Sequence, residues 1–500
     1  MDIDDGPAAR EEKESEEAAL PFPSKEPEIE LASKRSMKER QPSNLEDIEE
    51  TGERPGPTAH GNRKQTSTRL LTKTQLSDMA WGVRELSQRL GSIKLKLKVN
   101  TVFILTKTGD VSLIAKTREV AEWLLSPERD VPYTVFVEDR LQKCKKFDAE
   151  GFCKDKNDDQ CSRLKYWNRQ MCVDHPEIFD FVITLGGDGT VLYASWLFQK
   201  VVPPVLSFAC GSLGFLTQFD FEHFRETLTD AFRNGVRVSL RLRFEGTVMR
   251  AVEKQKEIIR KDDGTEMAVN NADASAALHL NCEHAQDESD SEDDERDLVE
   301  ELLTDEPDDS PTHKPTTTFS ILNDIIIDRG PSANLTTLEL FTSSASPSQS
   351  SPDSSTPTTH LTSLMGDGLC IATPTGSTAY NLAASGPLCH PSNPVMLLTA
   401  ICAHTLSFRP LILPDSIVLR VGVPYDARQG AWAAFDGRER VRLGRGDYVS
   451  VRAGRWPFAT VGRAEAGEWE SGLKCGLGWN TRGGPGGHDG RPKKLDRENL

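Results

Sequence analysis

"VITLGGDGTVLY" (residues 182–193) runs an apolar segment into three closely spaced glycines and a single aspartate, Asp188. The run FDFVITL that ends at residue 185 fits a buried strand, and TVLYASWLF, which follows the turn, has the pattern of a helix. Between such a strand and helix, a phosphate can meet free backbone N–H groups and the positive end of the helix dipole. The glycines, which let the chain turn and a nucleotide approach the backbone, are Gly186, Gly187 and Gly189. The stretch therefore predicts a nucleotide-binding turn.

The aspartate within this turn needs a chemical explanation. No G-x-x-x-x-G-K-[ST] sequence occurs in the chain, so the turn is not a P-loop. A carboxylate beside a phosphate repels that ligand unless it holds Mg²⁺ or accepts a proton from a hydroxyl group that attacks phosphorus. A structural alternative stays open at this point, in which Asp188 only caps the helix after a tight turn.

The segments on either side predict two kinds of domain. An apolar run at 100–107, a helical pattern at 117–125 and a strand pattern at 131–138 predict a βαβ unit with a parallel sheet. Beyond about residue 235 the sequence changes to short alternating strands, of which 237–249 is the first, with turn signals between them. We therefore expect an N-terminal α/β nucleotide-binding domain of the Rossmann-like kind, followed by a C-terminal β-sandwich domain.

Composition sets the expected boundaries. Residues 1–95 are mostly polar and are predicted to be a disordered tail that carries one helical pattern at 74–90. The other expected segments are the α/β domain at 96–230, the sandwich at 231–453 with disordered inserts at about 255–317 and 343–360, a C-terminal segment at 454–480 and a loose tail at 481–500. The first insert holds fourteen acidic residues and one arginine between Asp287 and Asp309. Because like charges at this density repel, we expect a solvated loop that does not join the sandwich core.

Charge and hydropathy limit the classes of partner. The net charge of −17 argues against nucleic-acid or anionic-membrane binding, and most of it lies in the acidic insert. No run of eighteen apolar residues predicts a membrane span, and the acidic N-terminus has no signal-like apolar core. A cytoplasmic location is therefore expected. Four clustered cysteines without a C-x-x-C pair favour reduced thiols over a zinc site; they are Cys144, Cys153, Cys161 and Cys172.

Two further segments have the chemistry to hold a sugar and a ring. TPTGSTAYNLAASG (373–386) offers hydroxyl groups and, at Tyr380, a flat ring with a polar tip. Alone, it is equally well explained as a Ser/Thr-rich turn that caps the next helix. Asn323 and Asp324 interrupt an apolar strand, where an amide and a carboxylate are costly to bury without partners. Ribose hydroxyls would supply those partners, and a backbone turn is the alternative.

Taken together, these motifs closely resemble the ATP-NAD kinase family. They occur in the family's order: LGGDGTVLYAS, GSLGFL, LNDIIIDRGPS, GDGLCIATPTGSTAYNLAASGP, CAHTLSFRP and FDGR. The resemblance covers about residues 98–250 and 318–480, and the long tails and inserts are typical of eukaryotic, fungal-like members. TPTGSTAY is its most specific part, whereas GGDG is shared with phosphofructokinases and lipid kinases.

The resemblance implies an activity. Such kinases transfer the γ-phosphoryl group of ATP, as its Mg²⁺ complex, to the 2′-hydroxyl of the adenosine ribose of NAD, giving NADP and ADP. It implies that Asp188 is the general base, with Gly189 beside it, and that Asn323 and Asp324 bind NAD. Further NAD contacts are implied for Phe215 against the adenine, for Thr378, Ala379 and Tyr380, and for Asp367 across a subunit contact. It also implies a homo-oligomer built from dimers, a tetramer or a hexamer, and a C-terminal segment that returns to the first domain.

Two departures from the family pattern and two rival functions accompany this expectation. The Ser/Pro-rich insert lengthens a loop just before Asp367, and Ala383 stands where relatives often carry a polar residue. The rivals are a lipid or sphingoid-base kinase that uses the same GGDG turn, and a dinucleotide sensor without catalysis. The motifs leave open whether NADH is also accepted and whether polyphosphate replaces ATP.

Overall fold

The computed structural model describes residues 94–154, 158–211, 213–252, 296–303, 312–344, 357–463 and 467–477. The predicted tail up to residue 93, its helical pattern at 74–90, most of both inserts and the last 23 residues lie outside the described residues. No helix in the described ranges is long and apolar enough to span a membrane.

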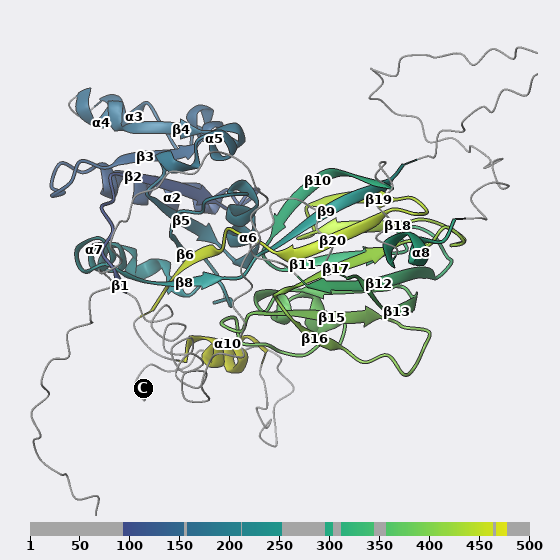
Figure 1. Ribbon diagram of the computed structural model, residues 1–500. Coiled ribbons are helices and arrows are strands. Elements are labelled where there is room, and N and C mark those ends of the chain that lie inside the picture. Colours follow the sequence, from purple (N-terminus) through teal and green to yellow (C-terminus); the bar gives the residue numbers. More distant parts are fainter. Residues whose placement is uncertain are drawn as a thin grey trace, which may run out of the picture. The chain divides into compact units, whose positions relative to one another are not determined.

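The first domain is built on one mostly parallel sheet (Figure 1). Its strand order is β1-β8-β21-β6-β5-β2-β3-β4, and β7 pairs with β6. The strands are β1 (Lys94–Leu95), β2 (Thr101–Thr106), β3 (Thr134–Glu138), β4 (Leu164–Trp167), β5 (Phe181–Gly186), β6 (Val205–Ala209), β7 (Phe219–Asp220), β8 (Val236–Arg241) and β21 (Phe458–Gly462). Its helices are α2 (Ser112–Leu125), α3 (Gly151–Lys154), α4 (Asp158–Arg163), α5 (Arg169–Asp174), α6 (Asp188–Leu197), α7 (Phe224–Asn234) and α10 (Glu468–Leu477), with 3₁₀ turns η2 (Asp139–Lys143), η3 (Pro176–Ile178) and η4 (Phe221–His223).

Apolar side chains on both faces explain this sheet. Every residue of β5 is buried, as expected for a parallel strand covered by helices on both sides. On one face, Ile183 and its neighbours pack under α2 and α7. On the other, Val182 packs with the buried side of α6. The predicted α/β domain is confirmed, and α6, which begins at Asp188, is the helix that follows the glycine turn.

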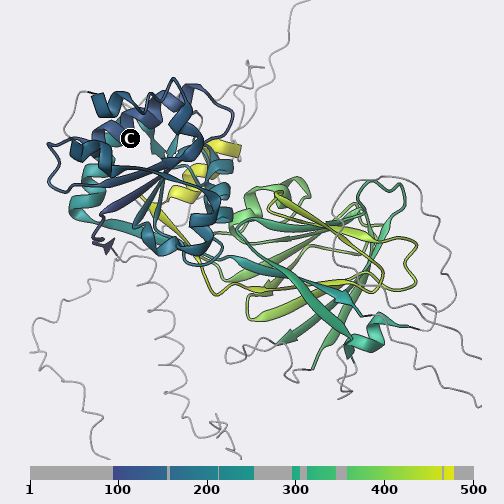
Figure 2. The same ribbon diagram turned by 90° about the horizontal axis from the view of Figure 1, so that it is seen from above.

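The second domain is a sandwich of two six-stranded antiparallel sheets (Figures 1 and 2). The first has the order β10-β9-β20-β17-β12-β13 and the second β16-β15-β14-β11-β18-β19. The strands are β9 (Phe244–Ala251), β10 (His313–Ile321), β11 (Asp324–Asp328), β12 (Thr336–Ser344), β13 (Thr359–Gly366), β14 (Gly368–Ala372), β15 (Val395–Ile401), β16 (Leu411–Pro414), β17 (Ile417–Gly422), β18 (Ala431–Phe435), β19 (Glu439–Leu443) and β20 (Tyr448–Ala453). Short helical pieces are α8 (Leu298–Leu303), η6 (Thr375–Thr378) and α9 (Tyr380–Ala383). The predicted sandwich is confirmed.

The chain crosses between the α/β domain and the sandwich twice, from β8 to β9 and from β20 to β21. One buried arginine contacts both of these passages. The segment 237–249, expected as one strand, is two strands in different sheets, because the chain turns inward at Arg243. The Arg243 guanidinium is fully buried and donates to backbone carbonyls of Trp456, at 2.7 Å, and of residues 195 and 198–200 at the end of α6. The second passage, from β20 to β21, carries Trp456 and donates the Gly454 N–H to the Arg243 carbonyl at 2.7 Å.

Part of the acidic stretch packs against the sandwich, so the expectation that all of it stays away from the core is wrong. Leu298 and Leu302 of α8 are buried against Phe341 and other residues on the outer face of the β9-containing sheet. Arg296 forms a two-pronged ion pair with Glu301 at 2.8 and 3.2 Å. Two buried leucines and a mostly buried ion pair offset the local negative charge, and the sequence-based expectation gave the charge density too much weight.

We expect Leu298→Ala to lower the free energy of unfolding by about 2 kcal/mol or more, because it leaves a cavity beneath α8. Leu303→Ala is the matched control, since Leu303 lies on the same helix with its side chain exposed, and its effect should stay within about 0.5 kcal/mol. Urea denaturation of the full chain measures both. Equal effects of the two substitutions would contradict the docking of α8.

Candidate active site

The glycine turn ahead of α6 leaves open space at the helix N-terminus. A Cβ at Gly186 would lie 2.3 Å from Thr190 Oγ1, so packing within the protein requires glycine there. A Cβ at Gly187 or at Gly189 would meet nothing within 4 Å, so packing does not explain these two glycines. The first N–H groups of α6 have no carbonyl partner within the helix. An anionic group can therefore approach this turn closely.

Asp188 is held by the second glycine turn of the first domain. Its Oδ1 accepts the N–H groups of Leu216 and Thr217, at 3.1 and 3.0 Å, and the Thr217 hydroxyl at 3.0 Å. Its Oδ2 accepts only the Phe215 N–H among these contacts, at 2.9 Å, and so keeps acceptor capacity. Gly187 is the N-cap of α6, and the hydrogen bonds of the Asp188 carboxylate go to residues 215–217 of the second glycine turn, so Asp188 does not act as the helix cap.

Gly214 is a site residue that sequence reasoning missed. A Cβ there would lie 2.1 Å from Oδ1 of Asp188, so the carboxylate occupies the space that a side chain would need. The signal was present in GSLGFL, where the second glycine stands one residue before Phe215.

Asn323 and Asp324 have satisfied backbones and free side chains. The Asp436 carboxylate accepts the N–H groups of Leu322 at 2.8 Å, Asn323 at 2.8 Å and Asp324 at 3.2 Å. Within the described residues no hydrogen bond holds the side chain of Asn323 or Asp324. Asp324 is only 6% exposed, and burial, followed by the charge of Asp436, raises its pKa to about 7. A pair of unpartnered polar side chains at the start of a buried strand is what a ribose site requires.

The TPTGSTAY segment divides into packing residues and exposed residues. Ser377 is fully buried, donates to the Cys389 carbonyl at 3.0 Å and accepts the Cys389 N–H at 3.1 Å. A Cβ at Gly376 would lie 2.2 Å from the Asn323 carbonyl oxygen, so this turn packs directly on the Asn323–Asp324 pair. The part that stays accessible is Thr378, Ala379 and Tyr380. The pKa of Tyr380 is raised, first by burial and then by nearby groups that include Asp324.

A tight hairpin joins these two parts of the site. Three residues, 436–438, connect β18 and β19; Asp436 and Gly437 have φ of 49° and 62°, and the Arg438 N–H donates to the Phe435 carbonyl at 2.9 Å, which closes a tight turn. On one side of this turn, Asp436 holds the Asn323–Asp324 backbone. On the other, Arg438 donates to the Gly189 carbonyl at 3.1 Å. The hairpin therefore brings the glycine turn and the Asn323–Asp324 pair together, although FDGR had been given no role from sequence.

The side chains of two predicted residues, Phe215 and Asp367, contact other parts of the structure. The Phe215 ring packs on α10, where a Cβ at Gly472 would lie 3.0 Å from it. Asp367 precedes β14, whose five residues span about 16 Å, and lies at the opposite end of that strand from the TPTG turn. It forms an ion pair with Arg329 at 2.8 Å. Within one chain the structure does not bring Asp367 to the other site residues.

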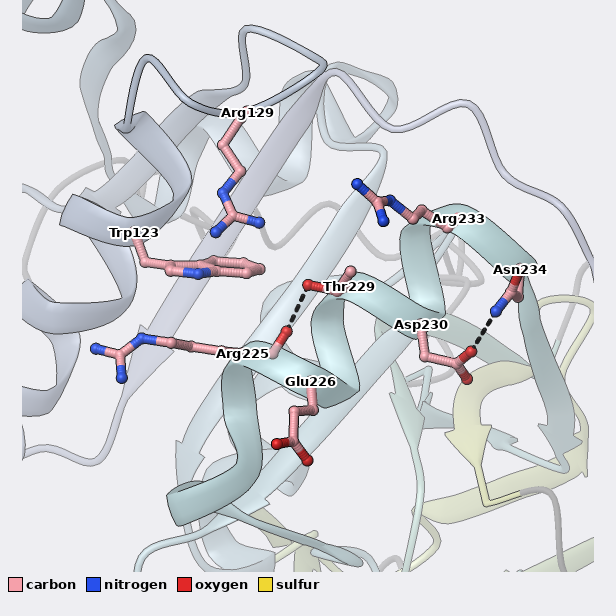
Figure 3. Close-up of a pocket in the computed structure, with 8 residues that line it drawn as sticks. All are labelled: Trp123, Arg129, Arg225, Glu226, Thr229, Asp230, Arg233 and Asn234. Carbon is pink, nitrogen blue, oxygen red and sulfur yellow. Dashed lines mark hydrogen bonds between the residues drawn. The ribbon is translucent and has the colours of Figure 1, made fainter.

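An open pocket of about 440 Å³ lies elsewhere, between α2 and α7 (Figure 3). Arg129 stacks on Trp123 there, with its guanidinium carbon 3.6 Å from the ring centre. The pocket contains none of the residues predicted from sequence. Two of its arginines are already paired on the surface, Arg225 with Glu119 and Arg233 with Asp130.

Metal ligands and thiols were also considered in the sequence. The described residues contain no group of three His, Cys, Asp or Glu side chains placed to hold a metal ion. Cys161 is disulfide-bonded, so the expectation of reduced thiols is wrong at that position. Cys144 and Cys172 are free thiols, and burial raises the pKa of Cys172 to about 12.

The raised pKa of Asp324 predicts a pH-dependent cost to stability. The folded state binds this proton more tightly than the unfolded chain, so the free energy of unfolding falls as pH rises from about 4 to 7. Above pH 7 the cost reaches at most about 4 kcal/mol. We expect Asp324→Asn to stabilise the ligand-free protein, by an amount that grows from pH 5 to pH 7.5 and then levels off.

Denaturant unfolding at a series of pH values measures this effect. Asp328→Asn is the control, because Asp328 lies on the same strand but is partly exposed and paired with Arg440 at 2.8 Å. A stability difference for Asp324→Asn that does not change with pH would contradict the assignment.

Comparison with known proteins agrees with this geometry. Models of the ATP-NAD kinase N-terminal and C-terminal domains match residues 102–236 and 322–462. The chain is 39% identical over 427 residues to the NAD(+) kinase of Saccharomyces cerevisiae, covering 85% of this chain and 68% of that protein. It is 37% identical to an ATP-NADH kinase of the same yeast, covering 81% and 69%. The crystal structure of yeast NADH kinase complexed with NADH is similar, with a TM-score of 0.54 at 26% identity, covering 78% of this chain and 90% of that one. The chain therefore belongs to the ATP-NAD kinase family.

Proposed function

We propose that the chain transfers the γ-phosphoryl group of ATP to the 2′-hydroxyl of the adenosine ribose of NAD, giving NADP and ADP. The observation that carries the proposal is the single hairpin tip that contacts both the glycine turn and the Asn323–Asp324 pair. A phosphate-binding helix N-terminus and a ribose-binding pair of polar side chains are the two parts that this reaction needs.

Each part has a role in the transfer. Asp188 accepts the proton of the 2′-hydroxyl through Oδ2, the oxygen that holds one donor in the structure. The 2′-oxygen bonds to the γ-phosphorus, the bond to the β–γ bridging oxygen breaks, and ADP leaves with that electron pair. The open turn at Gly187 and Gly189 admits the phosphates to the backbone N–H groups. Positioning and these dipoles supply most of the rate, because phosphoryl transfer needs little covalent chemistry from the protein.

Asn323 and Asp324 hold the ribose in this proposal, and Thr378, Ala379 and Tyr380 contact the dinucleotide. The free side chains of the pair support this role, as does the packing of the TPTG turn on their backbone. We retain the adenine contact at Phe215 as a proposal, since its ring is partly exposed beside α10.

Mg²⁺ enters as part of the ATP substrate. The described residues offer no three-ligand metal cage, so we propose that phosphate oxygens and water are its main ligands. We propose that the Asp188 carboxylate, which the second glycine turn holds in place, acts as a proton acceptor and not as a metal ligand.

We propose a homo-oligomer in which Asp367 reaches the site of a second copy. Two edge strands support this, because β13 and β16 end the two sheets of the sandwich and the His404 N–H joins the Met365 carbonyl at 2.8 Å on the same side. Apolar side chains are exposed along these strands and the neighbouring loop: Leu361, Met365, Leu406 and Ile412. An exposed apolar surface beside Asp367 suits an interface between copies. The tetramer or hexamer and the cytoplasmic location expected from sequence stay predictions.

One assay separates this proposal from its rivals. Purified chain with ATP, Mg²⁺ and either NAD or NADH should form NADP or NADPH. A lipid kinase would act on a lipid or sphingoid base instead, and a sensor would bind the dinucleotide without turnover.

We expect Asp188→Asn to lower kcat by about 10²- to 10⁴-fold, because it removes the proton acceptor, while NAD binding is largely kept. Thr217→Val is the control for the hydrogen bonds around this carboxylate, since it deletes one donor and leaves the base. Steady-state kinetics and calorimetric NAD binding measure the two effects. Turnover of Asp188→Asn close to wild type would rule out the general-base role.

Asn323→Ala and Tyr380→Ala should each raise the KM for NAD about 5- to 150-fold, the size expected for a lost buried hydrogen bond. The KM for ATP should change much less, because both residues belong to the sandwich side of the site. Equal increases for the two substrates would contradict the assignment of these residues to NAD.

A further inference from the structure

Arg438 makes two contacts with α6 from the tip of the β18–β19 hairpin. Its guanidinium donates to the Gly189 carbonyl at 3.1 Å, one residue after Asp188. The same group lies over the Tyr193 ring, with its central carbon 4.6 Å from the ring centre. A planar guanidinium can stack on a ring and donate an in-plane hydrogen bond at once, which a lysine cannot do. The two contacts together restrict how the first two turns of α6 can shift along the helix axis or rotate about it relative to the hairpin.

The need for such a contact follows from how the site is divided. Asp188 is fixed to the first domain by the turn at Phe215–Thr217, whereas Asn323 and Asp324 belong to the sandwich. Other polar and ring contacts between α6 and the sandwich lie near the C-terminal end of the helix, where Gln199 bonds the backbone of Ser320 and Trp196 stacks on Phe319. Leu322 adds an apolar contact, because it is buried in one cluster with Val191 and other residues of α6. Within the described residues, Arg438 supplies the hydrogen bond from the sandwich to the first turn of the helix.

Asp436 completes the connection on the other side of the same turn. It accepts three consecutive N–H groups from Leu322 to Asp324, and its own N–H donates to the Asp324 carbonyl at 3.0 Å. Only Gly437 separates Asp436 from Arg438, so this three-residue connection sets the spacing between the ribose-binding pair and the helix that carries the base. A misplacement of about 1 Å at such a site can cost about 100-fold in rate.

Resting on the proposed function, we propose that Arg438 is a positioning residue for phosphoryl transfer, which holds Asp188 in register with Asn323 and Asp324. Arg438 need not touch either substrate in this role. Its contribution appears in the chemical step, where the 2′-oxygen, the base and the γ-phosphorus must align, and much less in the binding of either substrate alone.

The hairpin offers a matched control. Arg440 lies two residues later, donates to Asp328 at 2.8 Å and stands 5.1 Å from the Trp432 ring. It therefore makes the same two kinds of contact as Arg438, a hydrogen bond and a cation–π contact, but both stay within the sandwich. Arg440→Ala removes them without touching α6.

The test measures kcat and both KM values for wild type, Arg438→Ala, Arg438→Lys and Arg440→Ala, with thermal unfolding of each. We expect Arg438→Ala to lower kcat about 10- to 100-fold and to change each KM by less than about 3-fold. Arg438→Lys should recover little of this loss, because it keeps the charge and loses the planar contact. Arg440→Ala should keep the wild-type kcat, and all four proteins should unfold at similar temperatures.

Several results would overturn the inference. Equal kcat losses for Arg438→Ala and Arg440→Ala would show that any disturbance of the hairpin lowers kcat and that the contact with α6 has no special role. A raised KM for ATP with unchanged kcat would make Arg438 a substrate ligand instead. If Arg438→Ala does not fold, the kcat of Arg438→Lys is the test. A wild-type kcat in Arg438→Lys would refute the positioning role. If the wild-type protein forms neither NADP nor NADPH, the proposed function itself is wrong. That result is distinguishable from the variant results, which test only the role of Arg438.

Discussion

The placement of α6 depends on a buried guanidinium at its C-terminal end. Arg243 is fully buried, and among the described residues its guanidinium bonds five backbone carbonyls, from the end of α6 and from the second passage between the domains. Burial lowers its pKa to about 10, so it stays charged at neutral pH and complements the negative end of the helix dipole. A cation with this many acceptors is costly to displace, because each carbonyl would be left unsatisfied. The Arg243 guanidinium therefore holds the two segments that connect the domains and the C-terminal end of α6 to one another.

The same device, a side chain that satisfies backbone groups, recurs at every turn of the site. Asp188 holds the turn at Phe215–Thr217, Asp436 holds the backbone of Asn323 and Asp324, and Ser377 holds Cys389. The backbone groups of these turns are hydrogen-bonded without a ligand, an arrangement that favours binding because less ordering is then needed. We propose that the side chains left without partners, those of Asn323 and Asp324, are the binding groups. The raised pKa of Asp324 is a cost of this arrangement, and such local costs are common where a structure is shaped for a ligand.

Local patterns in the sequence were sufficient for the domain classes and for much of the site. The apolar run into GGDG predicted β5 and α6, because strand burial and glycine turns are encoded within a dozen residues. The residues that escaped prediction act over long separations. Gly214 is needed because of Asp188, Arg438 because of Gly189, and Arg243 because of a segment more than 200 residues away. Composition also misled at α8, where two leucines within an acidic stretch, Leu298 and Leu302, were enough to form a buried face. Pairwise complementarity of this kind has no signature in a single sequence.

The central claim is that the GGDG aspartate and the Asn323–Asp324 pair act on one ribose. A crystal structure of the chain with NAD and a non-hydrolysable ATP analogue tests it most directly. The account predicts that Asp188 Oδ2 lies within about 2.6–3.2 Å of the 2′-oxygen of the adenosine ribose, with Asn323 and Asp324 bonded to the same sugar. A dinucleotide bound with its 2′-oxygen beyond reach of Asp188, or bound instead in the open pocket between α2 and α7, would contradict it.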